Sequence, residues 1–164
     1  LSSIGLDTLL VGAERVNGHG VGGDNELGAE VMRDDTNEVV DAVSGRVGSD
    51  CEAIIITAGL GGGTGSGGAP VLAHELKRVH DVPVYVLGVP PGRDAGALVR
   101  KAEGGRRVGR DDVSGLAQYI RHHYEAWAAD TRQRGASHEA LDPYRRRAQT
   151  ERMGAVLSGV CSDE

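Results

Sequence analysis

Cysteine, aromatic residues and long apolar runs are all scarce in this chain of 164 residues. The two cysteines, Cys51 and Cys161, are too few for a disulfide framework or a zinc signature. Phenylalanine is absent, and one tryptophan and four tyrosines leave the core to valine, leucine, isoleucine and alanine. No apolar run approaches the ~18 residues of a membrane span, and no secretion signal opens the chain. These absences predict a soluble, cytoplasmic protein without a membrane span.

Positive charge is also scarce, and almost all of it is arginine. Lys77 and Lys101 are the only lysines, and the net charge is −6. Binding of nucleic acid calls for a basic surface, so the charge balance argues against a nucleic-acid partner. An acidic, lysine-poor chain is consistent with the high-salt cytoplasm of a halophile, where net charge helps to keep a protein soluble. GC-rich coding would give the same arginine bias.

Glycine, by contrast, is abundant, and many of the 26 glycines gather in two loops. The denser loop follows residues 54–56, a β-branched block typical of a fully buried strand. Pro70 suits the first turn of a helix, because that position's N–H has no intrahelical partner. We therefore expect a strand, a glycine loop and a helix over residues 70–80. The candidate binding residues of this loop are Gly61, Gly62, Gly63, Thr64, Gly65, Ser66 and Gly67.

This loop has the features of a phosphate site. Glycines let the backbone approach a ligand, and a helix N-terminus presents N–H groups and the positive end of its dipole to an anion. A flexible linker is disfavoured between a buried strand and a proline-started helix, and a Walker loop would need a lysine. Gly63, Gly65 and Gly68 also satisfy the dinucleotide motif G-x-G-x-x-G, but residues 84–89 lack the acidic residue expected at the end of the next strand.

A second glycine loop, residues 18–23, leads into another helix. Asp24 or Asn25 can cap that helix, which we expect to begin at Glu26. A loop of small residues that ends at a helix N-terminus is again an anion site, although an ordinary cap without a ligand has the same pattern. The candidate binding residues here are Gly20, Gly22, Gly23, Asp24 and Asn25.

The order of the expected elements indicates an α/β fold. Residues 8–11 form a first predicted strand, a capping box of Asp35 and Glu38 starts a short helix, and residues 84–89 form another buried strand. Strand, helix and strand at this spacing imply parallel pairing. Ligands of such sheets bind at the carboxyl ends of the strands, where both glycine loops lie. A closing helix is expected to start near Asp142, its N-cap.

The string Gly-Gly-Gly-Thr-Gly-Ser-Gly at residues 61–67 resembles the phosphate signature of the tubulin/FtsZ superfamily. Residues 16–30 resemble that superfamily's second phosphate-side loop, in the form found in CetZ, the tubulin-like proteins of halophilic archaea. The resemblance covers about residues 9–92 and fades over 93–164. It implies a Rossmann-like GTPase domain of three layers, with helices on both faces of a mostly parallel sheet. Residues 1–164 would be a partial GTPase domain, without the first βα unit and the C-terminal activation domain.

The resemblance also implies a function. It suggests a cytoskeletal protein of cell shape or division that binds GTP or GDP, with Mg²⁺, and forms protofilaments with full-length homologues. Gly63, Thr64 and Gly65 would hold phosphate, and Asp94 would lie beside the family's ribose-binding position, here Ala95.

At the family's two guanine-reading positions this chain has Tyr124 and Arg146, where asparagine is usual. The acidic groups that activate water in this superfamily come from the next subunit's second domain. The resemblance therefore assigns no catalytic residue and no metal ligand to this chain, and we expect the chain alone not to hydrolyse GTP.

Several interpretations stay open. The chain fits a truncated or degenerate copy of an assembling GTPase, or a non-hydrolysing regulator that caps filaments of a full-length homologue. A dinucleotide-binding oxidoreductase is less favoured. His122, His123 and His138 stand in a polar region without further ligands at metal spacing, which is more typical of surface residues.

Overall fold

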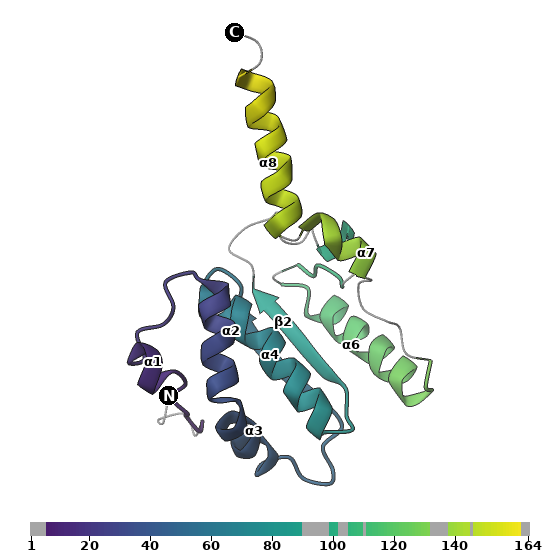
Figure 1. Ribbon diagram of the computed structural model, residues 1–164. Coiled ribbons are helices and arrows are strands. Elements are labelled where there is room, and N and C mark those ends of the chain that lie inside the picture. The colour runs from purple at the N-terminus through teal and green to yellow at the C-terminus, as the bar shows by residue number, and fades with distance from the viewer. Residues whose placement is uncertain are drawn as a thin grey trace. The chain divides into compact units, whose positions relative to one another are not determined.

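The computed structural model describes residues 6–89, 99–101, 105–109, 111–131, 138–144 and 146–161 (Figure 1). The chain divides into two compact units, Leu1–Pro91 and Gly92–Glu164. No helix within these described ranges is both long and apolar enough to cross a lipid bilayer. The first unit contains both glycine loops.

The first unit alternates helices with two strands. Its elements are α1 Ala13–Val16, α2 Asn25–Asp34, α3 Thr36–Ser44, β1 Ile54–Gly59, α4 Gly63–Val79 and β2 Val84–Val89. The strands pair in parallel, with Ile54 opposite Val84 and Gly59 opposite Val89. Two parallel strands joined by a helix form a βαβ unit. The expected α/β class and the parallel pairing are therefore confirmed.

The core of this unit lies between its helices and its sheet. α4 packs on both strands, and α2 packs along α4 (Figure 1). Leu76 of α4 is only 1% exposed and is the largest fully buried side chain among the described residues. The other buried apolar residues are short: Val21, Val31, Val39, Val40 and Ala69. Because each short side chain buries little area, such a core depends on close approach of its elements.

The residues of β1 alternate between partly buried and exposed, so the prediction of a fully buried strand is wrong. Ile55 is 50% exposed, and Val86 of β2 is 45% exposed. A strand is buried on both faces only where other elements cover both faces. In the described part of this unit, β1 pairs with β2 alone. The β-branched run predicted the strand itself correctly, since that preference is local.

The first predicted strand is not present. Residues 6–11 have no regular secondary structure, and Leu10 is 64% exposed. A strand needs a neighbour that pairs with its N–H and C=O groups. Within the described ranges the sheet consists of β1 and β2 and includes no part of this segment. A short apolar run is therefore not sufficient by itself to form a strand.

The second unit is helical in its described part. It contains α6 Val113–Ala128, α7 His138–Leu141, the 3₁₀ helix η2 Asp142–Tyr144 and α8 Arg146–Cys161. The closing helix begins at Arg146 rather than near Asp142, because the Asp142–Tyr144 segment forms the tighter 3₁₀ turn. α6 was not predicted, since its first residues show no clear helical period. Its N-cap Asp112 accepts a hydrogen bond from the Gly115 N–H at 2.8 Å, and that capping pattern is the signal that could have found it.

We expect Leu76 to be the largest single contributor to the core of the first unit. Leu76→Ala would leave a cavity at a fully buried site, where losses are about 2–5 kcal/mol of unfolding free energy. Val79→Ala on the same helix is the matched control and should cost much less, because Val79 is 47% exposed. Chemical unfolding of the full chain at high salt measures both. Equal losses in the two variants would contradict this description of the core.

Candidate functional site

The denser glycine loop runs directly into α4. The helix begins at Gly63, with Gly62 as an N-cap in an extended conformation. Its first internal hydrogen bond joins the Ser66 N–H to the Gly62 carbonyl at 3.1 Å. The N–H groups of Gly63, Thr64 and Gly65 therefore have no acceptor within the helix. Three donors converge where the positive end of the helix dipole lies.

The predicted start of this helix at Pro70 is wrong, because Pro70 lies inside α4. Each glycine disfavours a helix by about 1 kcal/mol relative to alanine, so helix propensity alone predicts a loop over the glycine string. The first turn of the helix is instead made by residues 63–66. The anion-binding end of the helix is thus formed by the glycine string itself.

The two hydroxyl groups of the string differ in their surroundings. Ser66 Oγ donates a hydrogen bond to the Gly62 carbonyl at 2.7 Å, and so closes the first turn of α4. Thr64 is exposed, and its hydroxyl has no hydrogen-bond partner among the described residues. Thr64 therefore has the hydroxyl that is available to a ligand at this end of the helix.

The second glycine loop, residues 18–23, lies close to the start of α4. Gly20, Gly22 and Gly23 have φ angles of 79°, 60° and 93°, in the left-handed region that favours glycine. Gly20 faces α4, since a Cβ built on it would lie 3.7 Å from Thr64 Oγ1. Gly22 and Gly23 face open space. The two loops are distant in sequence, but they meet at the start of α4.

Asp24 ends the second loop and caps α2. Its Oδ1 accepts hydrogen bonds from the N–H groups of Glu26 at 2.9 Å and Leu27 at 3.2 Å. Of the two predicted caps, Asp24 is confirmed, and α2 begins at Asn25, one residue before the predicted start at Glu26. Because the Asp24 carbonyl packs against Gly63, the N-termini of α2 and α4 are adjacent. Direct contact of the Asp24 carboxylate with a ligand stays a prediction.

The segment before the second loop is fixed to the far end of α2. The Arg15 guanidinium pairs with Glu30 and Asp34 at 2.6 Å each, and the hydrogen bond to Asp34 raises the pKa of Arg15 above its ordinary value. The Gly12 N–H donates to Asp35 Oδ2 at 2.6 Å. The capping box predicted at Asp35 is therefore wrong, because this carboxylate holds Gly12 and does not cap α3.

The remaining predicted positions belong to the part of the chain after Pro91. Asp94 and Ala95 are outside the described residues. Tyr124 lies in α6, with its ring centroid 5.9 Å from that of Trp127, and Arg146 is the first residue of α8. Both belong to the second unit, so their place beside a guanine base stays a prediction.

The histidines of α6 make aromatic contacts. The rings of His122 and His123 are 5.4 Å apart, and His123 packs edge-on against Tyr119 at 4.3 Å. Burial and, second, the neighbouring His122 lower the pKa of His123, which favours its neutral form. Within the described ranges no three His, Cys, Asp or Glu side chains gather as metal ligands would.

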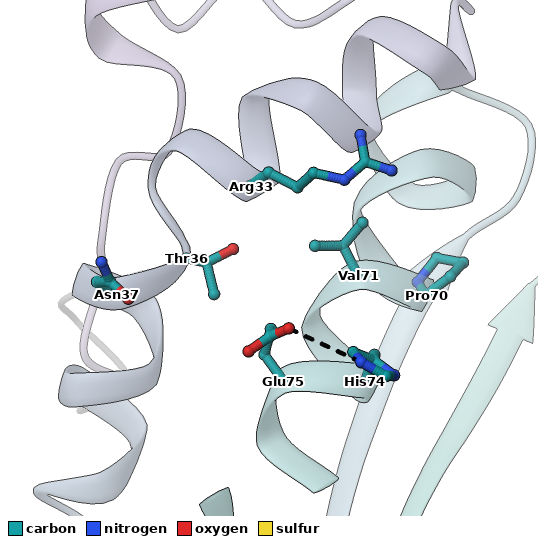
Figure 2. Close-up of a pocket in the computed structure, with 7 residues that line it drawn as sticks. All are labelled: Arg33, Thr36, Asn37, Pro70, Val71, His74 and Glu75. Atoms are coloured by element: carbon teal, nitrogen blue, oxygen red, sulfur yellow. Dashed lines mark ion pairs between the residues drawn. The ribbon is translucent and has the colours of Figure 1, made fainter. Parts of the chain in front are cut away.

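A separate groove of about 560 Å³ lies between α4 and the corner of α2 and α3 (Figure 2). Its lining residues are Arg33, Thr36, Asn37, Pro70, Val71, His74 and Glu75. The Glu75 carboxylate pairs with Arg78 at 2.8 Å and lies 3.9 Å from His74 Nε2. No residue of the two glycine loops lines this groove, so it is distinct from the site where the loops meet.

The sequence matches known proteins over its first part. Residues 2–102 match the family described as "Tubulin/FtsZ family, GTPase domain". Tubulin-like protein CetZ2 of Haloferax volcanii is 63% identical over 98 residues, which are 60% of this chain and 27% of that protein. Cell division protein FtsZ 1 of Pyrococcus woesei is 37% identical over 82 residues, which are 50% of this chain and 21% of that protein.

Solved structures give the same result. CetZ2 from Haloferax volcanii, solved as a GTPγS-bound protofilament, has a TM-score of 0.54 and 45% sequence identity to this chain. The match covers 79% of this chain and 46% of the CetZ2 chain. CetZ1 from the same organism, solved as a GDP-bound monomer, has a TM-score of 0.50 and 36% sequence identity. That match covers 82% of this chain and 47% of the CetZ1 chain. The predicted resemblance is confirmed, and the chain spans about a quarter of the length of the relatives named above.

The cap at Asp24 yields a stability prediction. Asp24→Ala removes the acceptor of two N–H groups and should cost about 1 kcal/mol of unfolding free energy, within a range of about 0.5–2. Asp24→Asn keeps an acceptor and should restore most of the loss. Asp34→Ala, at the other end of α2, removes only an exposed ion pair with Arg15 and should cost much less. Urea unfolding of the three variants is the measurement, and a loss in Asp34→Ala as large as in Asp24→Ala would refute the cap's role.

Proposed function

The chain belongs to the tubulin/FtsZ family, and on this premise we propose that its first unit forms the phosphate-binding part of a GTP site in a CetZ-like cytoskeletal protein. One observation carries the proposal: two glycine loops meet at the N-terminus of α4. There the N–H groups of Gly63, Thr64 and Gly65 lack acceptors within the helix. Phosphate oxygens would accept from them, and the helix dipole favours the negative charge.

The choice of a guanine nucleotide rests on the solved relatives. CetZ2 is described with GTPγS in a protofilament, and CetZ1 is described with GDP as a monomer. The identity to these chains is 45% and 36%. We therefore carry over to this chain both the guanine nucleotide and the partner, which is a full-length homologue in a protofilament.

The proposed roles follow the positions of the two loops. Residues 61–67 would hold phosphate through backbone N–H groups and the Thr64 hydroxyl, and residues 20–25 would close the site from the other side. Asp94 would lie near the ribose. Mg²⁺ in nucleotide sites is held largely by phosphate oxygens, water and one or two carboxylates. In this chain the main-chain carbonyl of Asp24 lies against Gly63, while its carboxylate caps α2. Mg²⁺ would therefore be held mainly by the phosphate oxygens and would enter together with the nucleotide.

For the whole protein we propose GTP hydrolysis coupled to protofilament assembly in the cytoplasm. Phosphoryl transfer asks a protein mainly for positioning and for stabilisation of charge. Backbone N–H groups that are already oriented provide both. Nucleotide binding is the step that the groups of the first unit would carry out.

Thr64 provides the test of this proposal. Thr64→Val keeps the shape of the side chain but removes a hydroxyl that would donate to a charged phosphate, a bond worth about 1.5–3 kcal/mol. The affinity for GTP and GDP should fall roughly 10- to 150-fold. Calorimetric titration of the full chain in concentrated KCl is the measurement. Ser66→Ala should lose less, since the Ser66 hydroxyl already donates to the Gly62 carbonyl.

Thr36→Val is the matched control, because it makes the same chemical change outside the site. Its hydroxyl donates to the Met32 carbonyl at 2.5 Å, so the variant should lose stability only. Equal nucleotide affinity in Thr64→Val and Thr36→Val would remove the Thr64 hydroxyl from the site. Absence of any GTP or GDP binding by the unmodified chain would overturn the proposed function itself.

A further inference from the structure

The first turns of α2 and α4 are in direct backbone contact at three glycines. A Cβ built on Gly28 would lie 2.7 Å from the Gly63 carbonyl carbon and 3.2 Å from the Thr64 nitrogen. One built on Gly63 would lie 2.5 Å from the Asp24 carbonyl carbon, and one on Gly67 would lie 2.7 Å from the Ala29 nitrogen. Real Cβ atoms essentially never approach other atoms within 3.0 Å. At these positions the neighbouring backbone occupies the space of a side chain.

Gly28 lies directly behind the proposed phosphate donors. It is buried at the end of the first turn of α2, and it faces the peptide that joins Gly63 to Thr64. That peptide supplies the Thr64 N–H. Gly28 is outside both glycine loops and would not touch a ligand, so any effect it has on binding must act through this peptide.

Gly65 continues the contact toward the sheet. A Cβ built on Gly65 would lie 3.3 Å from the Gly59 nitrogen and closer still to the Gly59 carbonyl oxygen. Neighbouring backbone therefore requires glycine at 63, 65 and 67, a requirement separate from the approach of a ligand. The start of α4 therefore touches both α2 and the end of β1 through backbone atoms.

We propose that Gly28 is a positioning residue, which locks the N-termini of α2 and α4 together so that both glycine loops present their N–H groups at a fixed spacing. Side chains at a helix contact can change rotamer, whereas a backbone-to-backbone contact leaves nothing to rearrange. A ligand that moves one loop must then move the other. This inference rests on the proposed nucleotide site.

The test compares Gly28→Ala with Gly68→Ala. A methyl group at Gly28 must displace the Gly63–Thr64 peptide, so the affinity for GTP should fall by at least about tenfold. Gly68 belongs to the same helix contact, but a methyl group there would meet the end of the Met32 side chain at 3.3 Å. Met side chains adapt readily, so Gly68→Ala should keep its affinity within about twofold.

A loss of stability alone must be distinguished from a displacement of the Gly63–Thr64 peptide. Leu76→Ala weakens the core without touching the loops, so below its unfolding transition it should bind GTP as the unmodified chain does. If Gly28→Ala, measured while folded, binds GTP as tightly as Gly68→Ala, the inference is wrong and the nucleotide site stands. If the unmodified chain binds no nucleotide, the proposed function fails first.

If Gly28→Ala does not fold, hydrogen exchange on the unmodified chain tests the inference instead. In the unmodified chain, GTP should slow amide exchange in residues 25–28 and 63–66 together, with the same dependence on GTP concentration. Protection confined to one of the two segments would show that the helix starts move independently, and would overturn the inference.

Discussion

The contact between the backbones of α2 and α4 is the constraint on which the rest of the first unit depends. Gly28, Gly63 and Gly67 bring the two helices so close that a methyl group would not fit between them. This approach accompanies the burial of Val31 and Leu76, which belong to the apolar core of the described residues. It also places the end of the second glycine loop, at Asp24, against the first residue of α4. The core and the candidate site are two results of one close approach.

The features that the sequence predicted are local ones. The strands Ile54–Gly59 and Val84–Val89 follow from β-branched runs, and the start of α2 follows from the cap at Asp24. The glycine strings mark both places where a helix begins, because glycine-rich segments at helix N-termini are typical of anion sites. The predictions that were wrong concern residues whose structure depends on partners distant in sequence. The Asp35 carboxylate binds Gly12 instead of its own helix, and residues 8–11 find no strand to pair with in the described structure.

The site was predicted less completely than its loops. Thr64 and Ser66 looked equivalent in sequence, and only the hydrogen bond from Ser66 to Gly62 separates them. The start of α4 at Gly63 was missed, since helix propensity disfavours glycine and the compensating contact with α2 is far away in sequence. Gly28 was also missed, although a glycine inside a helical pattern is a recognised sign of close packing. The sequence pattern does not show which segment packs against Gly28, and the proposed role of Gly28 depends on its contact with the Gly63–Thr64 peptide.

The most direct test of the central claim is an NMR titration of the full chain with GTP, followed through the backbone amides. The account predicts that the largest shifts occur at Gly63, Thr64 and Gly65, accompanied by Gly20 in the second loop. The groove lined by Arg33 and His74 provides the contrast within the same molecule. Shifts that gather around that groove, with the amides of residues 63–65 unchanged, would contradict the assignment of the phosphate site to the start of α4.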